Sequence, residues 1–222
     1  MGTLYLVRHG QASFGAAEYD QLSDLGQRQC QRLGEYFRAR GQVFEAVITG
    51  TLKRHRQSYA AIAAGLRSDT PALEMPGLNE YDSEAVIATV HPAKLGAATT
   101  PEQYRSHFRL LRDGLKRWIA GDAQPAGMPS HREFVAGVSA ALDHVRERHA
   151  GDVLLVSSGG PISCAVATIL GTAPEVMIDL NLRLRNSAVT EFVVTPKRHL
   201  LGSFNTLPHL AGVEDAGWIT YT

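Results

Sequence analysis

The sequence predicts an α/β protein of three layers, in which helices cover both faces of a mostly parallel central sheet. Short apolar or β-branched runs at residues 3–8, 46–49 and 153–156 alternate with longer stretches of helical periodicity. The run at residues 153–156 is Val-Leu-Leu-Val, apolar throughout, which is typical of a central parallel strand covered on both sides. We also expect a helical insertion in the middle of the chain and an antiparallel hairpin near its end.

The first half of the chain predicts alternating strands and helices. A strand at residues 3–8 leads into a polar, glycine-containing loop at residues 11–20. Ser23 is a good N-cap for an amphipathic helix at about residues 24–39, and Gly41 ends that helix. The next expected elements are a strand at residues 44–49, a helix at about 52–65, a short strand at 71–74 and a loop at 78–82.

The second half predicts the insertion and then a return to the sheet. Residues 83–150 are expected to be mostly helical, and the strongest helical patterns lie at residues 101–120 and 132–149. The elements expected after it are a strand at 152–157, a helix that has Pro161 in its first position and ends near residue 170, and hairpin strands at 188–194 and 200–204. We treat residues 1–222 as one domain with this insertion.

Composition excludes several classes of partner. The 222 residues carry 22 Lys and Arg against 22 Asp and Glu, so no net charge favours nucleic acid or a membrane surface. Apolar stretches such as residues 165–170 are too short to span a bilayer, and the N-terminus lacks a signal-peptide pattern. Cys30 and Cys164 are far apart and form no CxxC motif, so we expect free buried thiols. These observations predict a cytoplasmic protein.

The strongest functional signal is Arg8-His9-Gly10 at the end of the first strand. Open α/β sheets bind ligands beyond the C-terminal ends of their strands. The guanidinium of Arg8 can hold phosphate oxygens as a planar fork, and His9 can attack phosphorus or transfer protons. This stretch therefore predicts a phosphate site.

Three further stretches could contribute to that site. Residues 52–56, LKRHR, begin a helix and could bind an anion, although alone they also fit a solvated basic face. Glu80 could be a buried general acid or an exposed loop carboxylate. Residues 157–161, SSGGP, could cradle an oxyanion or form an ordinary turn between a strand and a helix.

Five ordered segments resemble the histidine phosphatase superfamily, which includes the cofactor-dependent phosphoglycerate mutases. LVRHGQ at residues 6–11 is similar to the opening motif of the family, and LSDLGQRQ at 22–29 to L-T/S-x-x-G-x-x-Q. TGTLKRHRQS at residues 49–58 resembles S-S-P-L-x-R-A-x-Q-T. LNE at 78–80 resembles L-x-E, and VSSGGPI at 156–162 resembles V-S/T-H-G-G-x-I.

The resemblance implies a role for each matching residue. His9 would be the nucleophile that becomes phosphorylated, and Arg8 and Arg54 would bind the phosphoryl oxygens. Glu80 would protonate the leaving oxygen and later activate water. The remaining phosphate contacts would come from Gln11, Ser13, Ser158 and Gly159. The resemblance implies no metal and no cofactor, and a phosphorylated small molecule as substrate.

The chain departs from the family pattern at Ser158, where the family has a second catalytic histidine. Loss of one preorganised donor of this kind costs about 3–4 kcal/mol, roughly a hundred- to a thousandfold in rate. Two hypotheses follow: a slow or specialised phosphohydrolase, or a catalytically disabled relative that binds a phosphorylated ligand or a protein. A mutase is a weaker alternative. Among the other histidines, His131 is the first candidate to replace the missing one, and no role is assigned to His55.

The segment at residues 83–130 is expected to shape the substrate pocket, as a cap. We expect Tyr104, Phe108 and Trp118 to form its core rather than to contact ligand. The outer strand of the hairpin offers an edge through which two copies could pair as a homodimer.

Overall fold

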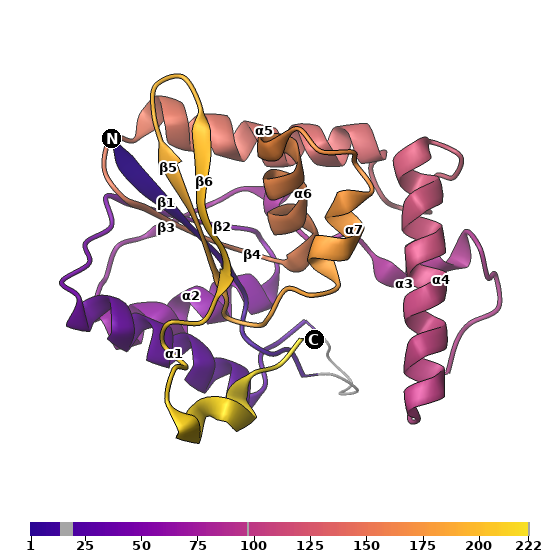
Figure 1. Ribbon diagram of the computed structural model, residues 1–222, viewed down its shortest axis with the longest axis horizontal. Helices are drawn as coiled ribbons and strands as arrows, with labels where there is room; N and C mark the ends of the chain where they lie inside the picture. The colour runs from indigo at the N-terminus through magenta and orange to yellow at the C-terminus, as the bar shows by residue number, and fades with distance from the viewer. Residues whose placement is uncertain (14–19, 97, 222) are drawn as a thin grey trace.

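The computed structural model describes residues 1–13, 20–96 and 98–221. Its centre is a six-stranded sheet in the order β3-β2-β4-β1-β5-β6 (Figure 1). The strands are β1 (Gly2–Arg8), β2 (Ala46–Thr49), β3 (Ala72–Glu74), β4 (Val153–Ser157), β5 (Val189–Val194) and β6 (His199–Thr206). The pairs among β1 to β4 are parallel, whereas β5 pairs antiparallel with both β1 and β6. The predicted fold class, with its C-terminal hairpin, is confirmed.

The described residues form seven α-helices, of which α4 stands away from the sheet beside α3 and α5 (Figure 1). They are α1 (Asp24–Ala39), α2 (Lys53–Leu66), α3 (Ser83–Ala88), α4 (Pro101–Ala120), α5 (His131–Arg148), α6 (Gly159–Leu170) and α7 (Val176–Asn181). Alternate side chains of each strand enter different cores, because successive residues of a strand point to opposite faces. In β1, Leu4 and Leu6 pack with residues of α5 and α6, whereas Val7 packs with residues of α1 and α2. The three layers follow from this alternation.

Helices α1 and α2 pack closely because glycines lie at their contact. A Cβ on Gly34 of α1 would lie 2.0 Å from the carbonyl oxygen of Ile62, and a Cβ on Gly65 of α2 would lie 2.1 Å from that of Gln31. The Ser23 hydroxyl accepts a hydrogen bond from the Gly26 amide and caps α1 as predicted. Gly41, at a φ of +64°, follows the end of the helix.

Between residues 83 and 150 lie α3, α4 and α5. Capping boxes begin both long helices, at Thr100 for α4 and at Ser130 for α5. Trp118 is buried as expected, but Tyr104 and Phe108 are 38% and 46% exposed, so assigning them to the core was wrong. Both residues lie in the N-terminal half of α4, whereas Trp118 lies near its C-terminal end. The cap function of this segment stays a prediction.

Three local features differ from the sequence-based expectations. Strand β2 begins at Ala46, two residues later than expected. Ser158 is the N-cap of α6, so Pro161 is the third helical residue rather than the first. Helix α7 was not predicted, because six residues carry too weak a local pattern and depend on packing against α6. Of the helices described, none is long and apolar enough to cross a membrane.

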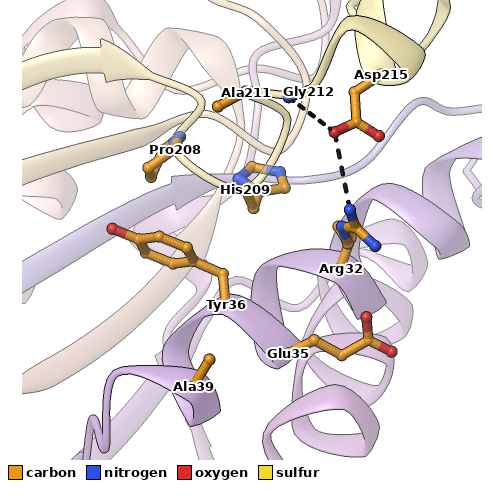
Figure 2. Close-up of a pocket in the computed structure, with 9 residues that line it drawn as sticks. All are labelled: Arg32, Glu35, Tyr36, Ala39, Pro208, His209, Ala211, Gly212 and Asp215. Carbon is orange, nitrogen blue, oxygen red and sulfur yellow. Dashed lines mark hydrogen bonds and ion pairs between the residues drawn. The ribbon is translucent and has the colours of Figure 1, made fainter.

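The segment after β6 returns to α1, and the two line an open pocket of about 340 Å³ (Figure 2). Its lining residues are Arg32, Glu35, Tyr36, Ala39, Pro208, His209, Ala211, Gly212 and Asp215. His209 is 4% exposed, and its Nε2 lies 2.9 Å from the Ser187 hydroxyl. Burial, and then the positive charge of Arg32, lowers the pKa of His209 to about 3. The imidazole is therefore neutral in the folded protein.

This burial predicts that His209 destabilises the fold in mild acid. In the unfolded chain a histidine titrates near pH 6.5, so below that pH the unfolded state binds a proton that the folded state refuses. The free energy of unfolding should therefore lose about 2 kcal/mol through this group between pH 7.5 and pH 5. His209→Gln should remove that loss, measured by urea unfolding at both pH values. The control is His107→Gln, on partly exposed α4; equal pH dependence in both variants would contradict the prediction.

Candidate active site

The candidate residues come from the C-terminal ends of three neighbouring strands. Strands β2, β4 and β1 are adjacent and parallel, so their C-terminal ends meet at one edge of the sheet. The backbone amide of His9 donates to the Ser157 carbonyl at 2.8 Å, and that of Gly50 donates to the Val156 carbonyl at 3.2 Å. These bonds extend the sheet pairing by one residue and bring the segments after β1, β2 and β4 together.

His9 lies at the centre of this edge and is 3% exposed. Its Nδ1 lies 2.7 Å from the Gly10 carbonyl oxygen. A carbonyl only accepts, so Nδ1 carries the proton and Nε2 keeps its lone pair. Burial, followed by the charges of Arg8 and Arg54, lowers the pKa of His9 well below its usual value. The imidazole is thus neutral, in the tautomer that a nucleophile at Nε2 requires.

Two guanidinium groups flank His9, and other groups position each of them. Nη1 of Arg8 donates to the carbonyls of Leu184 and, at 3.1 Å, Tyr221. Nη1 of Arg54 lies 2.8 Å from the carboxylate of Asp20, which also accepts from the backbone amides that begin α2. Arg8 and Arg54 are 9% and 7% exposed, so their charges act in a medium that screens them weakly. This arrangement favours an anion beside His9.

Glu80 faces the same edge from the loop before α3. Both of its carboxylate oxygens lie 3.1 Å from the Gly160 amide nitrogen. A Cβ on Gly160 would lie 2.1 Å from the nearer oxygen, so only glycine allows this approach. Burial raises the pKa of Glu80, against the opposing effects of the Gly160 amide, Arg54 and Arg8. The carboxyl group therefore keeps its proton to a higher pH than an exposed glutamate does, as a general acid requires.

Ser158 and Gly159 lie at the start of α6, whose N-terminus favours anions. The Ser158 side chain is fully buried, with its Oγ 3.5 Å from Nη2 of Arg54. A Cβ on Gly159 would lie 2.1 Å from Oδ1 of Asn181, so the first turn of α6 packs tightly against α7. The structure therefore brings His9, Arg8, Arg54, Glu80, Ser158 and Gly159 together.

Gln11 and Ser13 are not brought into this group by any contact that the structure shows. The Gln11 side chain accepts a hydrogen bond from the Ser23 hydroxyl at 2.8 Å, and its backbone amide donates to Gln29. Ser13 is held by its backbone amide, which donates to the Gln21 carbonyl. Gln11 thus contacts the N-cap residue of α1, and the phosphate contacts of Gln11 and Ser13 stay predictions.

Sequence reasoning missed His55. This histidine lies in the first turn of α2, is fully buried, and its Nε2 is 2.6 Å from Ser158 Oγ. His131, the candidate named from the sequence, instead packs its ring against Trp118, with the centroids 5.1 Å apart. The available signal was the residue type at position 55, because the motif that residues 49–58 resemble has alanine there.

The pocket beside α1 and the two cysteines contribute nothing to this site. The pocket in Figure 2 lies on the α1 side of the molecule and contains no predicted site residue. Within residues 1–13, 20–96 and 98–221, no cluster of three or more His, Cys, Asp or Glu side chains could hold a metal ion. Cys30 and Cys164 are buried free thiols.

Comparison with known proteins gives one family and a consistent fold. The family model of the histidine phosphatase superfamily (branch 1) matches residues 4–206. A probable phosphoglycerate mutase GpmB from Yersinia enterocolitica is 31% identical over 196 residues, which cover 84% of this chain and 82% of that relative.

Solved structures show the same fold at lower identity. A phosphoserine phosphatase from Entamoeba histolytica in complex with 3-phosphoglyceric acid has a TM-score of 0.65 at 19% identity and covers 95% of this chain and all of that one. The alpha-ribazole phosphatase from Shigella flexneri has a TM-score of 0.66 at 19% identity and covers 92% and 96%.

Proposed function

The chain belongs to the histidine phosphatase superfamily, and from this we propose that it hydrolyses phosphomonoesters through a phosphohistidine intermediate on His9. The observation that carries the proposal is the state of His9. Its imidazole is neutral, its Nδ1 is held by the Gly10 carbonyl, and its Nε2 is left as a nucleophile beside Arg8 and Arg54. A buried histidine retained only for packing has no need of two neighbouring cations, which make its protonated form less stable.

The reaction would proceed in two displacements. Nε2 of His9 attacks phosphorus, the bond from phosphorus to the leaving oxygen breaks, and Glu80 gives its proton to that oxygen. Water then attacks the phosphohistidine and gives a proton to the Glu80 carboxylate, while the phosphorus–nitrogen bond breaks and its electron pair returns to His9. Arg8 and Arg54 stabilise the charge on the phosphoryl oxygens in both steps.

Two other functions compete with this one. The curated relative is named as a probable phosphoglycerate mutase, which favours transfer of the phosphoryl group to a second hydroxyl instead of water. Ser158 favours a protein that binds a phosphorylated ligand without turning it over, because it stands where the family has a catalytic histidine. Retention of Glu80 in contact with Gly160 supports hydrolysis, since simple binding needs no general acid.

The three functions separate in one set of assays. We expect the purified protein to release phosphate from p-nitrophenyl phosphate, phosphoserine, sugar phosphates or 3-phosphoglycerate, measured with a colorimetric phosphate assay. A mutase would instead interconvert 2- and 3-phosphoglycerate in the presence of 2,3-bisphosphoglycerate, which ³¹P NMR would detect. A binding protein would release no phosphate from any substrate and would bind inorganic phosphate, measured by calorimetry. A phosphorylated small molecule stays our prediction for the substrate, and the cytoplasm stays our prediction for the location of the protein.

A further inference from the structure

We propose that His55, acting through Ser158, replaces the missing second histidine. In this arrangement His55 is a positioning residue that directs the Ser158 hydroxyl at a phosphoryl oxygen. The inference rests on the proposed function of the site. It concerns two residues 103 positions apart in the chain, which the fold places in direct contact.

The contact between the two side chains is short and completely enclosed. Nε2 of His55 lies 2.6 Å from Oγ of Ser158, and both residues are 0% exposed. The ring of His55 also faces that of His9, with centroids 5.9 Å apart and planes inclined by 33°. A second imidazole therefore lies beside the proposed nucleophile. It is supplied by α2 instead of by the turn between β4 and α6.

Gly50 provides the space for this imidazole. A Cβ on Gly50 would lie 2.2 Å from Nδ1 of His55, a distance that side-chain contacts do not allow. The motif that residues 49–58 resemble has serine at position 50 and alanine at position 55. The chain thus departs from the family pattern at three positions that touch: glycine makes room at 50, histidine fills it at 55, and serine shortens the side chain at 158. One spatial exchange accounts for all three.

The proton positions follow from the surroundings of His55. Burial, and then the charge of Arg54, lowers the pKa of His55 to about 3, so the ring is neutral and carries one N–H. Nδ1 has no hydrogen-bond partner among the described residues, so a proton there would be a buried unpaired donor. The proton therefore resides on Nε2 and is donated to Ser158 Oγ.

Ser158 Oγ then accepts from His55 and lies within reach of a second donor, Nη2 of Arg54, at 3.5 Å. With its acceptor sites directed at these two groups, its own O–H points away from both. With substrate bound, this O–H would donate to a phosphoryl oxygen held by Arg54. No covalent bond forms or breaks at Ser158 or His55; they supply one oriented hydrogen bond to charge that develops on the phosphoryl group.

A matched pair of variants separates this role from space filling. His55→Leu fills the cavity without a donor, and His55→Gln places an amide N–H₂ near the position of Nε2. We expect His55→Leu to lower kcat roughly 10- to 100-fold with little change in KM, as loss of an orienting outer partner does. His55→Gln should recover most of that loss. Equal activity of the two variants would overturn the inference, and thermal unfolding shows whether both fold.

Double variants test the exchange itself. Ser158→Ala should lower kcat about 10²-fold, and adding His55→Leu should lower it no further, because the two residues act as one unit. The double variant His55→Ala/Ser158→His should be about as active as the wild type. Ser158→His alone should be much less active, because the His55 ring occupies the space that the new imidazole needs. Additive losses, or full activity of Ser158→His alone, would overturn the inference.

Failure of this inference can be told apart from failure of the proposed function. If the wild type releases phosphate and His55→Leu does so equally fast, the hydrolase remains and His55 has no such role. If the wild type releases none and the double variant His55→Ala/Ser158→His does, both are overturned: the exchange has removed catalysis instead of preserving it. If the wild type releases phosphate, His55→Leu releases it more slowly and His55→Gln releases it at nearly the wild-type rate, both the inference and the proposed function stand.

Discussion

Replacing His9 by alanine should reduce phosphate release by at least about 10⁴-fold, to the level of buffer. Removal of the nucleophile from a covalent mechanism leaves only the residual effect of the binding groups. Arg8, Arg54 and Glu80 do not depend on His9 for their hydrogen bonds to Leu184, Asp20 and Gly160. Binding of inorganic phosphate should therefore change much less than the rate.

The same variant identifies the intermediate. Wild type quenched in alkali during turnover of a ³²P-labelled substrate should carry a base-stable, acid-labile label, and His9→Ala should carry none. His144→Ala, at a half-buried position of α5 outside residues 83–130, is the matched control and should behave like wild type. A labelled His9→Ala protein, or one that still turns over at more than a hundredth of the wild-type rate, would show that the nucleophile lies elsewhere.

The second large effect is expected for Glu80→Gln, which keeps the shape of the side chain and removes its transferable proton. General acid catalysis contributes about 10²–10⁴-fold. An alkyl phosphate needs a proton on its leaving oxygen, whereas p-nitrophenolate leaves readily without one. The first displacement should therefore slow by that factor with a sugar phosphate and much less with p-nitrophenyl phosphate.

The pH profile gives a separate readout of the same residue. Burial raises the pKa of Glu80, and only its protonated form is the acid, so wild-type phosphoryl transfer from sugar phosphates should fall as pH rises through that raised pKa. His9 has a lowered pKa and stays neutral across the same range, so it does not produce this fall. Glu80→Gln should lose this decline with rising pH in single-turnover measurements. Equal losses with both substrates, together with an unchanged decline, would assign the acid to another group.

Much of this molecule could be predicted from local signals in the chain. Ser23 and Gly41 mark the ends of α1, because a capping hydroxyl and a left-handed glycine act within one turn of the helix. The apolar run at residues 153–156 and the adjoining turn identified β4 and the start of α6. The order of strands and helices predicted a mostly parallel sheet, and the strand ends predicted where Arg8, His9 and Ser158 would meet.

Other features depend on contacts between segments far apart in the chain. Gln11 has the right position in its motif, but its side chain accepts a hydrogen bond from Ser23. The local sequence does not predict this contact. Helix α7 is too short to form on its own propensity and depends on packing with α6. Tyr104 and Phe108 have the residue types of a core but remain partly exposed in the N-terminal half of α4.

The sequence by itself determined the fold class and placed Arg8, His9 and Arg54 at strand ends and helix starts, which are local properties that topology then gathers; the family pattern added Glu80. Only the tertiary structure decided that His55 contacts Ser158 and that Gly50 leaves room for it. The physical reason is that two side chains 103 residues apart in the chain meet only through the packing of their helices, and the local sequence of neither helix specifies that packing.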